Sequence, residues 1–74
     1  MQTELLPNMI APIMVSEYQE AVNTAKHMAW ATKKRVIIGK FYKGRSYFVA
    51  QSGNTPSPNL WESVHLVTPD LKVL

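Results

Sequence analysis

Residues 39–46, GKFYKGRS, form the first stretch of this sequence whose residue types suggest chemistry. They match the phosphate-binding pattern G-x-x-x-x-G-K-[ST] at Gly39, Gly44 and Ser46, but Arg45 stands in place of the lysine. In a true P-loop the second glycine leads into a helix, whose free amides and dipole hold the phosphate. Here strand-forming residues lie on both sides of Gly44, and 74 residues are too few for a nucleotide-hydrolase domain. We therefore predict a β-hairpin at this position.

The other residues with catalytic potential are few and far apart. The only two histidines, His27 and His65, have no further ligands at metal-binding spacing. The five Asp and Glu residues form no recognisable acid–base pair, and no serine lies in the context of a hydrolase nucleophile. We predict no catalytic residue, no metal site and no cofactor, and hence a protein that is not an enzyme.

Length and composition limit the architecture. A chain of 74 residues is expected to form one small domain over residues 1–74, whose core is only marginally stable on its own. Assembly into a homo-oligomer would enlarge that core. The chain has no cysteine, its first basic residue is Lys26, and Pro12 interrupts the apolar stretch 9–15. These features argue against a disulfide framework, a signal peptide and a membrane span, and favour a cytoplasmic protein.

Positive charge is concentrated in the middle of the sequence. The net charge is only +3, yet seven of the eight Lys and Arg residues lie in the segment 26–45. No Asp or Glu occurs from Ala21 to Trp61. Such a segment attracts an anionic partner, either an acidic protein surface or a nucleic acid or nucleotide. A solvated surface that only keeps the protein soluble is the simpler alternative.

The clearest secondary structure is a helix over residues 17–33. The run SEYQ is typical of a capping box, in which Ser16 accepts a hydrogen bond from the amide of Gln19 and the Gln19 side chain reaches back. The charges near the two ends suit the helix dipole; they are Glu17, Glu20, Lys33 and Lys34. The apolar stripe consists of small residues, Ala21, Ala25 and Ala29. We expect this stripe to lie close against a sheet.

Two β-rich runs, RVIIGKFY and RSYFVAQ, are joined by Lys43-Gly44, which is the length of a tight hairpin turn. Counting outward from that turn predicts the facing pairs Tyr42–Arg45, Phe41–Ser46, Lys40–Tyr47, Gly39–Phe48 and Ile38–Val49. One face of the hairpin is then uncharged and is expected to meet the helix; it carries Ile37, Gly39, Phe41, Ser46, Phe48 and Ala50. The opposite face carries Val36, Ile38, Lys40, Tyr42, Arg45, Tyr47 and Val49.

The rest of the chain gives weaker signals. Residues 1–8 are expected to be a loose lead-in, and 9–15 a short strand that Pro12 places at a sheet edge. Residues 52–59 have the composition of a loop, in which Ser57-Pro58 favours one helical turn. Residues 64–67 suit a fourth strand, and the last four residues an added edge strand. The predicted fold class is α+β, β-α-β-β with a further strand, with one helix packed on an antiparallel sheet.

The predicted working surface is the basic and aromatic end of the hairpin, Lys40, Tyr42, Lys43, Arg45 and Tyr47. A second interface is expected around Trp30, Lys33 and Lys34. We expect the hairpin to dock on an acidic protein, as an inhibitor, adaptor or regulator would. The alternative is that the two tyrosines stack on bases while the cations neutralise phosphates.

Overall fold

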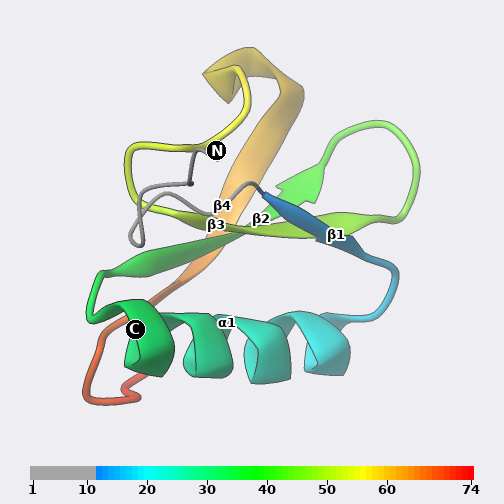
Figure 1. The fold of residues 1–74 in the computed structure, drawn as a ribbon. Coiled ribbons are helices and arrows are strands. Elements are labelled where there is room, and N and C mark those ends of the chain that lie inside the picture. The colour runs from blue at the N-terminus through cyan, green and yellow to red at the C-terminus, as the bar shows by residue number, and fades with distance from the viewer. Residues whose placement is uncertain (1–11) are drawn as a thin grey trace, which may run out of the picture.

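The computed structural model describes residues 12–74, in which four antiparallel strands form one sheet and a helix covers one of its faces (Figure 1). The elements in chain order are β1 (Ile13–Val15), α1 (Tyr18–Thr32), β2 (Val36–Phe41), β3 (Tyr47–Gln51), the 3-10 turn η1 (Pro58–Leu60) and β4 (Trp61–Val67). The strand order is β1-β3-β2-β4, so the hairpin of β2 and β3 is central. The α+β class and the β-α-β-β-β order are confirmed. The predicted lead-in 1–8 and the first residues of the predicted strand 9–15 lie outside the described residues.

The helix has the predicted position and core stripe, but its two ends differ from the prediction. Ala21, Ala25 and Ala29 are fully buried against the sheet, as their spacing predicted. The capping box is wrong, because Glu17 is the N-cap and no side chain caps the helix. Glu17 has an extended backbone, and its carbonyl accepts from the amide of Ala21 at 3.0 Å. Ser16 therefore lies one residue before the cap.

At the other end the helix stops at a single residue with left-handed geometry. Lys33 has φ 60° and ψ 27°, and its amide donates to the carbonyl of Ala29 at 2.9 Å. This arrangement satisfies one of the last helical carbonyls and turns the chain toward β2. Lys33 and Lys34 thus follow the helix, whereas the sequence had placed them in its last turn.

The predicted hairpin register is confirmed. β2 and β3 pair with Lys40 opposite Tyr47, Gly39 opposite Phe48 and Ile38 opposite Val49. The amide of Phe41 also donates to the carbonyl of Ser46 at 3.2 Å. The connection is a bend over residues 42–45 in which Gly44 has a positive φ of 83°. Glycine is suited to that position because it has no Cβ to clash with the backbone.

The assignment of the hairpin faces is wrong. The buried cluster under the helix contains Val36, Ile38 and Val49, which belong to the face that carries the charges. The residues of that face in the buried cluster are aliphatic and lie far from the turn, and Tyr47 packs at the margin of the cluster. The charged side chains toward the turn are not part of the buried cluster. A mixed face can therefore be a core face when its charges are gathered at one end.

The uncharged face is buried by aromatic residues and a loop. Phe48 is fully buried there, with the Trp61 ring edge-on at 4.8 Å and the Phe41 ring at 5.4 Å between centroids. The Trp61 indole Nε1 donates to the carbonyl of Pro56 at 3.1 Å, which ties the loop before η1 to this face. In Figure 1 that loop lies on the side of the sheet opposite α1. The sheet is consequently packed on both sides.

Gly39 makes this aromatic packing possible. A methyl group in place of its hydrogen would overlap the Phe48 ring and come within 2.7 Å of Cε3 of Trp61. The sequence correctly assigned Gly39 the task of leaving room for Phe48. It wrongly placed the helix on the other side of that space, which Trp61 occupies.

β4 is longer than predicted, and the residues after it fold back along its free edge. Its pairing with β2 shifts between Ile38 and Gly39, so that β4 has a bulge at Val64, which packs against the core under the helix. The expected turn at Ser57-Pro58 is present as η1. The expected final strand is reduced to a bridge of Val73 to Val67, flanked by paired hydrogen bonds between Leu66 and Leu74.

Gly39→Ala is expected to destabilise the domain by about 1–3 kcal/mol, because Phe48 and Trp61 must move to admit the methyl group. An ordinary glycine in a strand would give the opposite sign, since alanine costs less backbone entropy. Thermal or urea unfolding measures the difference. Ser63→Ala is the matched control, because Ser63 is exposed on β4 directly opposite Gly39. Equal stability of the two variants would contradict the packing described here.

The turn after β4 contains a carboxylate whose pKa lies below its ordinary value. The Thr68 hydroxyl donates to Asp70, and Lys72 lies 3.8 Å away, so both favour the charged form. The resulting stabilisation is present above the pKa of the unfolded chain and is lost as the pH falls through the lower folded value. Thr68→Val is expected to raise the pKa of Asp70 more than Lys72→Gln does, as measured by NMR titration of the carboxyl carbon. A larger effect of Lys72→Gln would contradict this ranking.

Candidate functional site

The five predicted binding residues lie together at one end of the central hairpin. We call this set, Lys40, Tyr42, Lys43, Arg45 and Tyr47, the hairpin end. Its tip residues Tyr42, Lys43 and Arg45 are exposed, and Tyr42 leaves 62% of its surface accessible. Lys40 and Tyr47 face one another across β2 and β3 and are half-buried. The hairpin end thus has a base, Lys40 and Tyr47, that is paired in the sheet, and a tip that is exposed to solvent.

Tyr47 belongs partly to the core. It packs against the buried cluster, and its ring lies 5.9 Å from that of Tyr18 in the first turn of α1, at an angle of 59°. Tyr18 also lies 5.7 Å from the ring of His65 on β4, and His65 Nδ1 is 3.0 Å from the carbonyl oxygen of Leu74. This row of rings joins the start of the helix to β3 and β4. Tyr47 therefore anchors the hairpin end to the core and is less available to a partner than the exposed tip residues are.

One acidic residue lies beside the hairpin end, and sequence reasoning missed it. Lys40 pairs in register with Glu62 of β4 on the side of β2 away from Tyr47. A Lys and a Glu at directly opposed positions attract one another across a sheet. Within residues 12–74, however, the only ion pair joins Lys72 to Asp70. Predicting that Glu62 lies opposite Lys40 would have required the register of β4 with β2, and that register depends on the bulge at Val64.

Six of the seven cations of the basic segment form two groups in the fold, and the seventh, Lys26, lies within α1. Lys33, Lys34 and Arg35 lie between the end of α1 and the start of β2, whereas the cations of the hairpin end lie at the far end of β2. Lys40 follows Arg35 by five residues along the strand, which is roughly 17 Å of strand length. This exceeds the screening length of about 8 Å at physiological salt. The two groups of charge are therefore largely screened from one another at that salt concentration.

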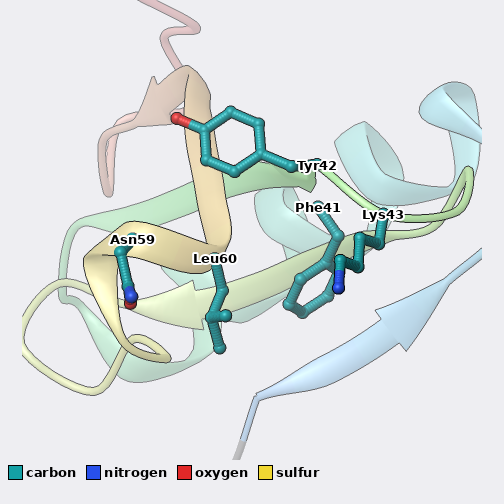
Figure 2. Close-up of a pocket in the computed structure, with 5 residues that line it drawn as sticks. All are labelled: Phe41, Tyr42, Lys43, Asn59 and Leu60. Carbon is teal, nitrogen blue, oxygen red and sulfur yellow. The ribbon is translucent and has the colours of Figure 1, made fainter.

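An apolar hollow of about 180 Å³ adjoins the tip of the hairpin. Its lining residues are Phe41, Tyr42, Lys43, Asn59 and Leu60. Figure 2 shows the side chains of Phe41 and Leu60 on one side of the ribbon, with Lys43 beside Phe41 and the Tyr42 ring on the opposite side. The amide of Tyr42 donates to the carbonyl of Leu60 at 3.1 Å, which fixes the tip to η1. The hollow combines an apolar floor with a cation at its rim.

The second predicted interface lies at the exposed surface of the last turn of α1 and the two residues after the helix. Trp30 is 57% exposed, and the Lys33 ammonium lies 4.8 Å from the centre of its ring. Lys34 is exposed nearby in the chain. A shallow hollow of about 350 Å³ is lined by Lys26, His27, Trp30 and Leu71. The structure thus brings Trp30 and Lys33 together and adds three residues to their neighbourhood that the sequence had not grouped with them.

Comparison with known protein families, with curated proteins and with solved structures finds no match to this chain. The part of the chain that the structure describes has no helix long and apolar enough to cross a membrane. Nor do residues 12–74 contain a group of three or more His, Cys, Asp or Glu side chains placed to hold a metal ion. Proposals about function therefore start from the geometry of the two surfaces.

The row of rings predicts an energetic coupling between Tyr18 and Tyr47. In a double-mutant cycle with leucine at each position, measured by urea unfolding, we expect a coupling energy of about 0.5–1.5 kcal/mol. The control cycle combines Tyr18 with Tyr42, whose ring is exposed at the tip, and should be additive. Additive behaviour of the Tyr18 and Tyr47 substitutions would contradict a role of their ring contact in fixing the hairpin end.

Proposed function

We propose that this protein is a non-enzymatic binding protein that docks the hairpin end on an acidic protein surface, as an inhibitor, adaptor or regulator. The proposal rests on the exposed side chains and the hollow at the tip of the hairpin. Tyr42, Lys43 and Arg45 are exposed there, and Tyr42 and Lys43 also line an apolar hollow. Glu62, opposite Lys40, is the one carboxylate within residues 12–74 that pairs in register with the hairpin end. Tyrosine and arginine are the residues that most often dominate the binding energy of protein interfaces.

The rigid base of the hairpin end favours binding without a large entropic cost. Lys40 and Tyr47 are paired in the sheet, and the amide of Tyr42 is hydrogen-bonded to Leu60. A preorganised surface loses less conformational freedom when it binds than a mobile loop does. The hollow beside Lys43 accepts an apolar side chain, and the cation at its rim attracts an acid next to that side chain. The expected partner surface therefore combines an apolar residue with flanking Asp or Glu.

Nucleic acid is the alternative partner, and the charge distribution makes it the weaker choice for this surface. The hairpin end has only three cations, one of which lies opposite Glu62. With three phosphate contacts, the binding constant falls with about the third power of the salt concentration or less steeply. The other cations of the segment lie in α1 or between α1 and the start of β2, and cannot add to the same short contact. A protein partner requires fewer charges and uses the tyrosine and the hollow as well.

A displayed library of random peptides tests the proposal across many candidate partner sequences at once. The folded 74-residue protein is the bait, and selection is made at physiological salt. We expect the enriched peptides to be rich in Asp and Glu and to share an apolar residue next to the acids. The best of them is then synthesised as the probe. Failure to enrich acidic peptides would contradict the proposal.

Binding of the selected peptide to variants locates the site. Tyr42→Ala and Arg45→Ala are each expected to raise its Kd by about tenfold or more. Lys43→Gln is expected to act mainly by slowing association, with an effect that shrinks at high salt. Lys34→Gln removes the same charge at the distant end of β2 and should leave the Kd unchanged. Because Tyr47 packs on the core, Tyr47→Phe is the informative change there and should alter the Kd only slightly.

Random single-stranded DNA and RNA, titrated over a salt series, provide the opposing test. The proposal predicts weak binding whose salt dependence corresponds to about three phosphates or fewer. Affinity for RNA or DNA well above that for the selected peptide, lost in Tyr42→Ala and Arg45→Ala, would assign the hairpin end to nucleic acid.

A further inference from the structure

The hollow around Trp30 is a second candidate site, far from the hairpin end and not needed for the proposed function. We propose that it binds a nucleoside phosphate, whose base stacks on the Trp30 indole while Lys26 attracts its phosphate. We call the site the Trp30 hollow and define it by its lining, Lys26, His27, Trp30 and Leu71. The proposal rests on the exposed indole of Trp30, which lies between lysines on the surface of α1 and shares the hollow with Leu71 from the turn after β4.

The spacing along α1 places cations on both sides of the indole. Lys26 and His27 precede Trp30 by four and three residues, and Lys33 follows it by three, so all are neighbours on the helix surface. The Lys33 ammonium lies 4.8 Å from the ring centre. Trp30 lines the hollow, whereas Lys33 does not. A flat ligand ring can stack there and reach a lysine with an attached anion.

Leu71 forms the facing wall of the hollow, and its position is fixed. It has φ 68°, and its amide donates to the carbonyl of Thr68 at 2.9 Å. The neighbouring carboxylate of Asp70 accepts from Thr68 and pairs with Lys72, so it is neutralised within its own turn. The groups that line the hollow are therefore apolar, aromatic or basic, and none is acidic. This combination is complementary to an anion that carries a flat apolar ring.

Exposure of the indole supports a ligand over a purely structural role. A tryptophan that stabilised the core would be mostly covered, but Trp30 leaves 57% of its surface accessible. The volume of about 350 Å³ lies within the range of about 300–1,000 Å³ that small-molecule sites occupy. Stacking on an aromatic side chain tolerates any base, because every base has a π-face. The proposal therefore concerns the nucleotide class and does not select one base.

The two tryptophans make the test self-controlled. In a proton–nitrogen NMR spectrum each indole N–H gives one signal. The Trp61 indole donates to Pro56 on the opposite face of the sheet, whereas that of Trp30 lies at the proposed site. AMP is the first probe. We expect a saturable shift of the Trp30 signal, with a Kd on the order of 1 mM or tighter, and no shift of the Trp61 signal.

Two further probes separate the ring from the phosphate. Adenosine retains the base without charge, and inorganic phosphate retains the charge without a ring. Each is expected to bind at least about tenfold more weakly than AMP, since stacking and charge pairing are both required. No saturable shift of Trp30 with AMP would overturn the proposal. An equal response to inorganic phosphate alone would also overturn it, because the lysines would then act without the indole.

Variants identify the residues that hold the ligand. Trp30→Leu is expected to reduce AMP affinity by about tenfold or more, followed through the amide signals of α1, while the unchanged Trp61 signal shows that the fold persists. Lys26→Gln should weaken AMP binding, and Arg35→Gln, which removes an exposed cation outside the lining, should not. Equal effects of Lys26→Gln and Arg35→Gln would reduce the interaction to general attraction and would overturn the assigned geometry.

A short oligoadenylate distinguishes the two sources of this chemistry. If the natural ligand is a free nucleotide, AMP and the oligonucleotide bind with similar affinity per site. If it is a single strand, the oligonucleotide binds more than about tenfold more tightly and with a steep salt dependence. Both outcomes support binding of a nucleoside phosphate at Trp30. Binding that persists in Trp30→Leu but is lost in Arg45→Ala would place the nucleotide at the hairpin end and overturn this assignment.

Discussion

The contact between the Phe48 ring and the backbone of Gly39 is the constraint on which the rest of the structure depends. It fills the space of a missing side chain with a ring from the neighbouring strand, and Trp61 closes the same space from β4. The contact thereby fixes the register of β2 with both of its neighbours. Through the indole of Trp61 it also holds the loop at Pro56 against the sheet. One glycine thus connects three strands and a loop.

Packing on both faces explains how so short a chain builds a core. The helix contributes small residues, so α1 lies close to aliphatic side chains of β2 and β3. Within residues 12–74 the opposite face is covered by no second α-helix, and three large aromatic rings pack there instead. Aromatic residues bury a large area per residue and are an economical way to complete a layer. The same division leaves the turn end of the hairpin beyond the buried cluster, and the predicted binding residues are found there.

The sequence was sufficient for elements with strong local signals. Periodicity gave the helix and its alanine stripe, and the two residues Lys43-Gly44 gave the hairpin register to the residue. It failed where the outcome depended on distant parts of the chain. From the sequence, the uncharged face could have packed against either the helix or a loop. Trp61 packs on that face and holds the loop there, which the local sequence of the hairpin does not indicate. The pairing of Lys40 with Glu62 depended on a bulge that no local pattern announces. The hairpin residues were correctly grouped at one end, whereas the surroundings of Trp30 required the turn that contains Leu71.

The folding back of the chain after β4 has a consequence for how the sheet ends. Hydrogen bonds of Leu66 with Leu74 and of Thr68 with Lys72 use the outward backbone groups at this end of β4, so another strand cannot pair there. The remaining stretch of the β4 edge includes Glu62, and a charge on an open edge discourages the addition of a further strand. On the other side of the sheet, β1 has only three residues. Both margins are thus poor templates for fibril-like growth.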